Sequence, residues 1–147
     1  MEHQHLQIVA VGGVVYHCTA QRQLELLLIK KHGGFWTLPK GRSKPSEHPI
    51  AAVQREIFEE TGLAGVVEAP MCDVIYQILK RGQPCRTIVT YYLFCAEAGR
   101  LRPDKREGIR RLRWFPLRHA LARIQRDRVR NVVQHASTLL QDVSAEA

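Results

Sequence analysis

Long hydrophobic runs are missing from this chain. No uninterrupted apolar stretch is long enough to span a bilayer, and the polar start MEHQHLQ is unlike a signal peptide. Neither an internal repeat nor a low-complexity linker interrupts the 147 residues. The sequence therefore predicts one cytoplasmic domain over residues 1–147, with no membrane partner and with a tail that frays from about residue 142.

Cysteine is scarce and lacks the spacing typical of metal sites. The four cysteines include no CxxC pair, so neither a zinc site nor a disulfide framework is indicated. Three of them lie within or beside apolar, strand-like segments. We therefore expect buried free thiols in a reducing compartment at Cys18, Cys72, Cys85 and Cys95.

Acidic residues are outnumbered, with 14 Asp and Glu against 22 Lys and Arg and a formal net charge of +8. Such a charge suits a polyanionic partner, for example a phosphorylated small molecule or nucleic acid. An excess of basic residues also occurs without a specific partner, as on the solvated face of a helix. The C-terminal third carries several of these charges, at Arg118, Arg123, Arg126, Arg128 and Arg130.

Residue patterning predicts an α/β domain. Strand-like runs cover residues 6–18, 24–31 and 112–115, and a short strand runs through FWTLPKG. Two more strands should form a hairpin around RGQP. The second of these is apolar on both faces, which is typical of a central strand covered by helices on both sides. Helical spacing between about residues 116 and 140 predicts a short helix followed by a longer one.

The stretch GRSKPSEHPIAAVQREIFEETGL, from Gly41 to Leu63, combines a polar loop with a predicted helix. Pro49 suits the first turn, where a missing N–H is tolerated, and Gly62 suits the position just past the helix end. One arc of roughly 100° on that helix holds Glu56, Glu59 and Glu60. The opposite arc holds Ile50, Ala51, Ile57 and Phe58.

Neighbouring carboxylates repel one another unless a cation or a proton lies among them. Acidic residues on one side of an amphipathic helix usually form only a solvated face. Here Glu47, in the preceding loop, can add another carboxylate, and Arg55 can hold a carboxylate in place as a charged donor. We therefore predict a metal site.

These residues resemble the Nudix box, a pattern of glycine, glutamate and arginine at fixed spacing. The matching positions show no departure from the pattern: Gly41, Glu47, Arg55, Glu56, Ile57, Glu59, Glu60, Gly62 and Leu63. The resemblance implies the Nudix α/β/α sandwich, a mixed β-sheet with the box loop and helix on one face and a C-terminal helix on the other. It also implies a pyrophosphohydrolase, an enzyme that cleaves diphosphate linkages.

The resemblance further implies roles for the box residues. Glu56, Glu59 and Glu60 are expected to hold Mg²⁺ or Mn²⁺, which prefer oxygen ligands, with Glu47 beside them. Arg55 should orient the carboxylates, and Glu56 is a common candidate for accepting the proton of the attacking water. Replacing Glu59 or Glu60 by glutamine should abolish metal-dependent turnover and leave the fold intact.

Two further metal ligands are implied outside the helix. Family members often use the carbonyl of the residue before the first box glycine, which here is Lys40. They often carry another carboxylate in a loop before a strand tryptophan, and Glu107 precedes Trp114 in this way. A surface salt bridge explains Glu107 equally well.

The approach to the box, FWTLPKG, resembles members that cleave dinucleoside polyphosphates, and relatives acting on inositol pyrophosphates or oxidised nucleoside triphosphates. A dinucleoside polyphosphate such as diadenosine tetraphosphate is the favoured substrate. Trp36 is either a stacking partner or a core aromatic, and Lys40 is either a phosphate contact or a solvated lysine. The expected substrate-binding residues are Trp36, Lys40, Arg42 and Lys44.

Two functions of other classes stay open on sequence alone. The arginine-rich segment from Arg100 to Arg130 suits an RNA-binding or RNA 5′-end-processing protein. A non-catalytic Nudix module would instead sense a nucleotide, although regulatory relatives tend to lose box glutamates that this chain retains. The oligomeric state is also open, with a homodimer among the options.

Overall fold

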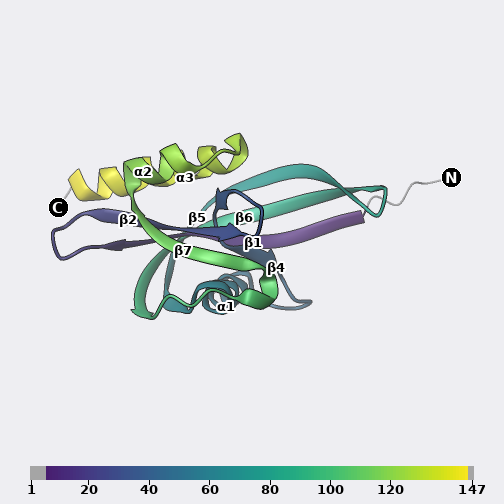
Figure 1. Ribbon diagram of the computed structural model, residues 1–147, viewed down its shortest axis with the longest axis horizontal. Helices are drawn as coiled ribbons and strands as arrows, with labels where there is room; N and C mark the ends of the chain where they lie inside the picture. Colours follow the sequence, from purple (N-terminus) through teal and green to yellow (C-terminus); the bar gives the residue numbers. More distant parts are fainter. Residues whose placement is uncertain (1–5, 146–147) are drawn as a thin grey trace.

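The computed structural model describes residues 6–145, with side chains described as far as residue 141. Figure 1 shows a sheet between helices, in the chain order that the sequence predicts. The strands are β1 (Leu6–Cys18), β2 (Leu24–Lys31), β3 (Trp36–Thr37), β4 (Lys40–Arg42), β5 (Leu63–Lys80), β6 (Gln83–Gly99) and β7 (Ile109–Pro116). The helices are α1 (Pro49–Thr61), the 3₁₀ turn η1 (Lys105–Glu107), α2 (Leu117–Arg123) and α3 (Asp127–Ala145).

One mixed, seven-stranded sheet organises the domain. Its main path runs in the order β3-β2-β1-β6-β5, while β4 pairs with β1 and β7 pairs with β2. The pair β1–β6 is parallel, and the other pairs among the described strands are antiparallel. The predicted hairpin is β5–β6, which turns through Arg81 and Gly82, both with positive φ. The predicted mixed sheet is confirmed.

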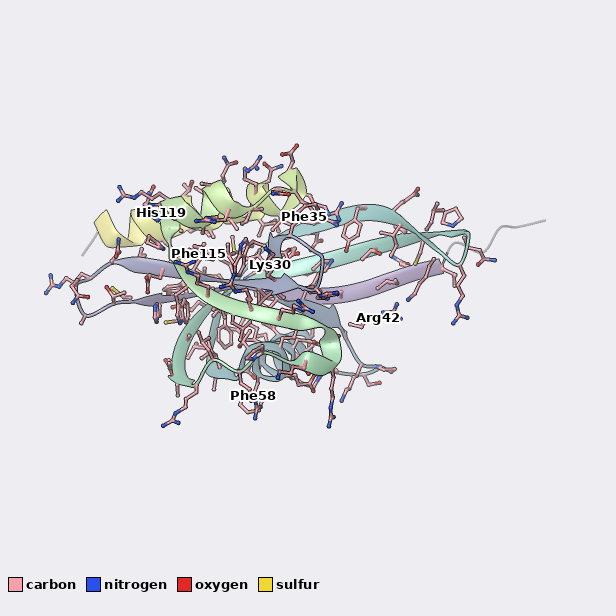
Figure 2. The ribbon with its side chains drawn as sticks, in the orientation of Figure 1. Lys30, Phe35, Arg42, Phe58, Phe115 and His119 are labelled. Atoms are coloured by element: carbon pink, nitrogen blue, oxygen red, sulfur yellow. The ribbon has the colours of Figure 1, made fainter. Side chains whose placement is uncertain are left out.

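Helices cover both faces of the sheet. On one face, α2 and α3 enclose the core around Leu28 and Phe115 (Figure 2). On the other face, α1 packs Ile57 against the sheet in a second core around Phe94. Strand β6 supplies both cores, because Val89 faces the first core and Phe94 belongs to the second. The α/β/α arrangement, with the box helix and the C-terminal helix on opposite faces, is confirmed.

Local sequence sets both ends of α1. His48 is the N-cap, its Nδ1 accepts the Ile50 N–H at 3.2 Å, and Pro49 occupies the first turn. Gly62 ends the helix in the left-handed conformation with a φ of 83°, and its N–H donates to the Phe58 carbonyl at 2.9 Å. The helix therefore begins and ends where the sequence predicts.

The buried side of α1 differs from the arcs drawn on the sequence. Of the four apolar residues opposite the carboxylates, only Ile57 is buried, whereas Ile50, Ala51 and Phe58 are exposed. Burial follows Ala52, Val53, Ile57 and Glu60 instead. The division of α1 into an acidic face and an opposite apolar face was wrong, because Glu60 is buried and Glu56 half-buried on the side that meets the sheet, while Glu59 is exposed.

The cysteines are free thiols, but only Cys85 is buried. Cys18 is exposed, and Cys72 and Cys95 are partly exposed. The expectation of four buried thiols was wrong, because Cys18 ends β1 and Cys72 lies on β5, the edge strand of the main path.

Within residues 6–145, no helix is long and apolar enough to cross a membrane. The backbone of α3 is helical as far as Ala145. The prediction that the tail frays from about residue 142 covers the last turn of this helix and residues 146–147. Residues 146–147, like the first five residues of MEHQHLQ, lie outside the described part of the chain.

Candidate active site

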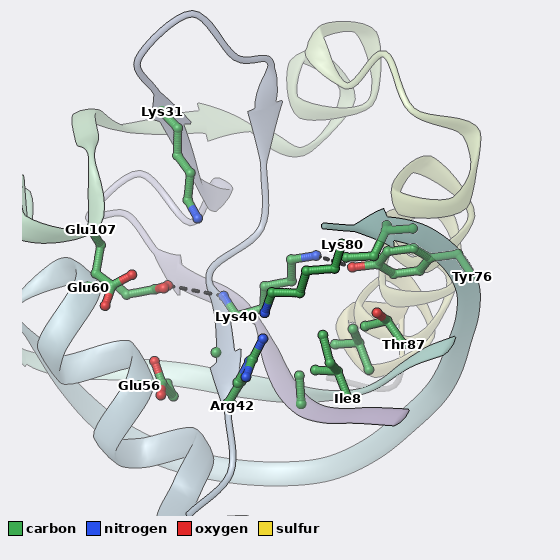
Figure 3. A pocket seen from close by; sticks show the side chains of 14 residues that line it. Ile8, Lys31, Lys40, Arg42, Glu56, Glu60, Tyr76, Lys80, Thr87 and Glu107 are labelled. Atoms are coloured by element: carbon green, nitrogen blue, oxygen red, sulfur yellow. Dashed lines mark hydrogen bonds between the residues drawn. The ribbon is translucent and has the colours of Figure 1, made fainter. Parts of the chain in front are cut away.

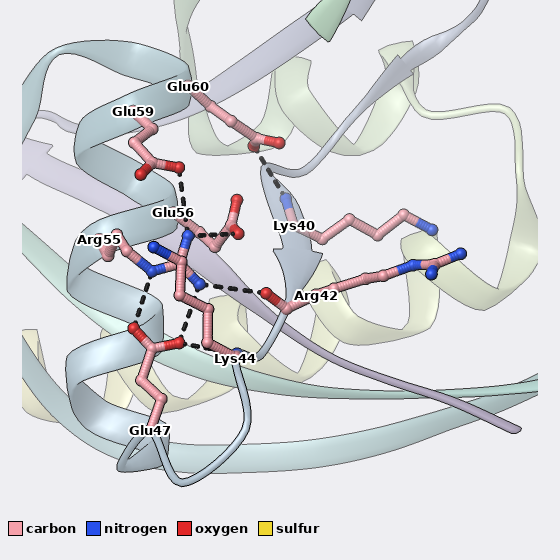
Figure 4. Close-up of polar contacts among 8 residues, drawn as sticks. All are labelled: Lys40, Arg42, Lys44, Glu47, Arg55, Glu56, Glu59 and Glu60. Atoms are coloured by element: carbon pink, nitrogen blue, oxygen red, sulfur yellow. Dashed lines mark hydrogen bonds and ion pairs between the residues drawn. The ribbon is translucent and has the colours of Figure 1, made fainter.

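Arg55 is the centre of a charged network between α1 and the loop before it (Figure 4). Its Nε donates to Glu47 Oε2 at 2.7 Å and its Nη2 to Glu47 Oε1 at 2.9 Å, which makes a bidentate pair. Its Nη1 donates to Glu56 Oε1 at 2.8 Å and to Glu59 Oε2 at 3.2 Å. Its Nη2 also donates to the Arg42 carbonyl at 3.1 Å. One guanidinium therefore holds three box carboxylates and the end of β4.

The network sets the ionisation of Glu47. Hydrogen bonds from Arg55, and then from the Lys44 N–H, lower the pKa of Glu47 to about 2. The bonds to Glu47 in turn raise the pKa of the Arg55 guanidinium. Both groups stay charged at neutral pH, so the pair is a permanent anchor for the loop.

Glu60 and Glu56 are the least exposed carboxylates of the box. Glu60 is 2% exposed, and its Oε2 accepts the Lys40 N–H at 3.0 Å. Burial, together with the nearby charge of Glu56, raises the pKa of Glu60 to about 8. Burial also raises the pKa of Glu56, against the lowering effect of its hydrogen bond from Arg55. A cation beside these two carboxylates would relieve the cost of their charges.

Gly41 leaves room for the carboxylate of Glu56. A Cβ atom at position 41 would lie 2.0 Å from Glu56 Oε2, well inside any permitted contact. A side chain at this position would displace the Glu56 carboxylate. The first glycine of the box is therefore required by the close approach of β4 to α1.

A cavity of about 560 Å³, here named the first cavity, opens beside the box (Figure 3). Acidic and basic side chains gather at one end of it: Lys31, Lys40, Arg42, Glu56, Glu60 and Glu107. The rest of the lining comes from β1, β5 and β6: Ile8, Ala10, Tyr76, Ile78, Lys80, Thr87 and Val89. This combination suits an anionic chain held by lysines and arginine while carboxylates hold a cation.

Several predicted site residues do not line the first cavity. Trp36 packs edge to face on Phe115 with ring centres 5.1 Å apart, which favours the core-aromatic alternative. Lys44 is exposed, and its N–H donates to Glu47 Oε1 at 3.0 Å. Glu59 and Glu47 reach the site only through Arg55.

Lys40 lies with its side chain along the cavity. Its Nζ donates to the Tyr76 hydroxyl, so it is not a freely solvated loop lysine.

A smaller cavity of about 170 Å³, the second cavity, adjoins the first at Lys31 and Lys40. Phe35 lines it with 47% of its surface exposed, and the Arg126 guanidinium carbon lies 5.7 Å from the centre of the Phe35 ring. Arg128 lines it as well, with its guanidinium carbon 3.9 Å from the centre of the Tyr76 ring. The second cavity therefore offers aromatic and cationic groups beside the charged end of the first.

Sequence patterns did not point to Lys31, Lys80 or Phe35 as site residues. The available signal was slight: Phe35 is an aromatic directly after two glycines, and the lysines end predicted strands. Arg126 and Arg128 were expected either on the solvated face of a helix or in an arginine-rich segment that binds RNA. Their place in the site depends on how the start of α3 packs beside β3.

The donor set fits a divalent cation, although the side chains are not arranged as a cage. Across the described residues, no three His, Cys, Asp or Glu side chains converge closely enough to hold a metal ion. Arg55 engages three carboxylates, and Glu60 turns toward the Lys40 N–H. The oxygen-only donors and the raised pKa values of Glu56 and Glu60 are nevertheless what Mg²⁺ or Mn²⁺ would match.

Comparison with known protein sequences identifies the family. The family model described as NUDIX domain matches residues 6–136. The protein named MutT4 of Mycobacterium tuberculosis (strain CDC 1551 / Oshkosh) is 27% identical over 111 residues, which cover 76% of this chain and 44% of that protein. The chain thus spans less than half the length of this curated relative.

Solved structures share the fold. A Caenorhabditis elegans Ap4A hydrolase in a binary complex has a TM-score of 0.73 at 22% identity, covering 92% of this chain and 98% of that one. The NUDIX domain of Shewanella oneidensis NrtR, complexed with ADP ribose, has a TM-score of 0.73 at 20% identity, covering 91% and 88%. The family typically uses a divalent metal. Because the family model covers most of the residues, the chain belongs to the NUDIX domain family.

Proposed function

We propose that this chain hydrolyses a diphosphate linkage in a dinucleoside polyphosphate such as diadenosine tetraphosphate. The observation that carries this proposal is the charged end of the first cavity, where Glu56 and Glu60 lie with three basic side chains. A phosphate chain needs cations along its length, and its cleavage needs a site that activates water at one phosphorus atom. Basic side chains and carboxylates suited to these two requirements lie in one cavity, which supports the proposal.

Three carboxylates line the first cavity and would hold Mg²⁺ or Mn²⁺ through their oxygen atoms: Glu56, Glu60 and Glu107. The Lys40 carbonyl belongs to the same proposed set through the family resemblance. Glu47 and Glu59 support it through Arg55. A divalent ion bound there supplies neutralisation of phosphate charge and a bound water of lowered pKa.

Glu56 accepts the proton of the attacking water in this proposal. Arg55 holds Glu56 Oε1, so that Oε2, which lies toward Gly41, is the oxygen free to act. Burial raises the pKa of Glu56, which makes its carboxylate a stronger base than one on the surface. Arg55 positions this base, while Lys31, Lys40 and Arg42 hold the phosphates.

Two cavities that meet at Lys31 and Lys40 support a substrate with two nucleosides. The phosphate chain would pass these lysines, with one nucleoside in the first cavity and the other in the second. Phe35 offers a ring on which a base can stack, and Arg126 and Arg128 add positive charge beside it. A nucleoside triphosphate would leave one of the two cavities without a base.

A product-release screen with Mg²⁺ or Mn²⁺ tests the proposal. The substrates are dinucleoside polyphosphates, ordinary and oxidised nucleoside triphosphates, nucleotide sugars, capped RNA and inositol pyrophosphates. We expect ion-dependent turnover that is fastest with the dinucleoside polyphosphate, and its loss in Glu60→Gln and Glu59→Gln with unchanged circular dichroism. Turnover of no class would favour a nucleotide sensor, and salt-sensitive RNA binding without hydrolysis would favour an RNA-binding protein.

A further inference from the structure

The second half of β5 is a free edge of the sheet. Strand β5 ends the main path and, among the described strands, pairs only with β6. From Cys72 to Lys80 this pairing runs without a register shift. The end of the β5–β6 hairpin reaches beyond α1 and α3 (Figure 1). A strand edge of this kind presents a row of backbone N–H and C=O groups to which another strand can add.

Other strand edges carry features that oppose such pairing. The first half of β5 has three register shifts and contains Pro70, which cannot donate to a neighbouring strand. Strand β7, at the side of β2, carries Arg110, Arg111 and Arg113. The segment VIYQIL, residues 74–79 of β5, contains no proline, no glycine and no charged residue. The second half of β5 therefore lacks the usual protection against strand pairing.

Two large apolar side chains on this half of β5 are exposed. Ile75 has 54% of its surface exposed, and Leu79 has 76%. Val74 packs against the core under α2 and α3, so the alternation of strand side chains turns Ile75 and Leu79 toward the opposite face of the sheet. Two exposed apolar residues on one face of a free edge suit contact with the side chains of an added strand.

A second copy of the same edge fits these side chains. In a symmetric antiparallel pair of β5 strands, every contact between two different positions forms twice. With Gln77 on the two-fold axis, Ile75 lies opposite the partner's Leu79. In the same register, Asp73 lies opposite the partner's Arg81. Asp73 Oδ1 accepts a hydrogen bond from Thr90 Oγ1 at 2.7 Å, which leaves Oδ2 for the arginine.

Neighbouring registers fit less well. A shift of two residues in one direction places Asp73 opposite the partner's Leu79, and in the other direction it places Ile75 opposite the partner's Arg81. A shift of one residue turns facing side chains to opposite faces of the sheet. Apolar contact and charge complementarity therefore select the same register, the one centred on Gln77.

We propose that this chain forms a symmetric dimer in which the β5 edges, from Asp73 to Arg81, pair antiparallel and join the two sheets. The interface is small, so the dimer should exchange with the monomer at micromolar concentrations. Tyr76 and Ile78 line the first cavity, so the pairing places the first cavities of both copies on the same face of the joined sheet. This inference goes beyond the proposed function, and its test requires no turnover.

Analytical ultracentrifugation of the full chain across a wide range of concentrations tests the dimer. The average mass of the wild type should rise from that of one chain toward that of two. Ile75→Lys replaces the apolar contact with a cation and should weaken the dimer about tenfold or more. Val66→Lys is the matched control, because Val66 is 45% exposed on the irregular half of β5, and it should dimerise like the wild type.

An exchange of charges tests the register. Asp73→Arg and Arg81→Asp should each weaken the dimer, because each places like charges opposite one another. The double variant restores the ion pairs with reversed signs and should dimerise like the wild type. Aspartate suits position 81, where φ is 53°. Circular dichroism checks the fold of every variant.

Hydrogen exchange tests the dimer without any variant. Backbone amides between residues 73 and 81 should exchange more slowly at high than at low concentration of the wild type. A chain that stays monomeric up to millimolar concentration, or exchange that does not depend on concentration, would overturn the dimer. A dimer unaffected by Ile75→Lys, or a folded double variant that does not recover it, would do the same. A dimer that hydrolyses no nucleotide would remove the proposed function alone.

Discussion

Arg55 binds both carboxylate oxygens of Glu47, with Nε 2.7 Å from Oε2 and Nη2 2.9 Å from Oε1. This two-point pair ties α1 to the loop that precedes it and leaves Nη1 for Glu56 and Glu59. The planar guanidinium is the reason one residue can do all of this, since an ammonium group has no fixed fork of donors. The position of the proposed base, Glu56, is therefore set by Arg55.

Arg55→Lys keeps the positive charge but removes the planar guanidinium, whose Nε and Nη2 donate to both oxygens of Glu47. We expect kcat to fall by about 10- to 100-fold, because Glu56 and the loop lose their common anchor while substrate contacts stay. The metal concentration needed for half-maximal activity should rise in parallel. Steady-state kinetics with a metal titration measure both, and circular dichroism controls for the fold. A variant with the kcat of the wild type would show that the network does not position Glu56.

Gly41→Ala places a methyl group where the Glu56 carboxylate lies, 2.0 Å from Oε2. Because Gly41 itself has no positive φ, the effect should come from this contact and not from backbone strain. We expect activity to drop by about tenfold or more, with a modest fall in melting temperature. Ser43→Ala, directly after β4 and outside the first cavity, is the control. Equal activity in the two variants would contradict the fit between Gly41 and Glu56.

Much of the fold could be predicted from local patterns. Pro49 and Gly62 marked the ends of α1, and RGQP marked the β5–β6 turn, because these residues restrict the backbone wherever they occur. The two-sided apolar pattern of β6 predicted a strand between helical layers, since strand side chains alternate between faces.

The buried side of α1 could not be predicted in the same way. Helical periodicity gives the angles between side chains, but it does not say which arc meets the sheet. Glu60 is buried because the Lys40 N–H reaches it from β4, and no spacing within the helix contains that contact. Likewise, Phe35 and Arg126 come together only through the packing of α3 beside β3.

The raised pKa of Glu60 predicts that the stability of the fold depends on both pH and metal. Its folded-state pKa of about 8 lies above the ordinary 4.5. The protonated group therefore stabilises the fold fully below pH 4.5, and this contribution is lost as the pH rises toward 8. Without metal, the wild type should lose more stability over this interval than Glu60→Gln, which cannot ionise.

Millimolar Mg²⁺ should raise the melting temperature of the wild type by several degrees near pH 8 and by little near pH 5, where a proton competes for Glu60. Thermal melts with EDTA or Mg²⁺ across this range provide the measurement. Glu60→Gln should respond weakly to Mg²⁺ at either pH. Parallel curves for the two proteins would mean that Glu60 neither titrates in this range nor binds the ion.

Because Phe35 lines the second cavity, its replacement should change KM for one class of substrate and not for another. If one base of a dinucleoside polyphosphate stacks on its ring, Phe35→Ala should raise KM for that substrate about tenfold, since a stacked base contributes on the order of 1–3 kcal/mol. KM for a nucleoside triphosphate should stay nearly the same, because its base lies in the first cavity. Arg126→Ala should act in the same direction, since its guanidinium lies beside the ring.

Phe58→Ala is the matched control for Phe35→Ala, because Phe58 is 50% exposed against 47% for Phe35 and lies on the outer side of α1, outside both cavities (Figure 2). It should leave both KM values unchanged. Equal losses on both substrates in Phe35→Ala would mean that the ring contacts a group which the two substrates share. No loss on either substrate would remove the second cavity from the path of the substrate, and with it the argument for a second nucleoside.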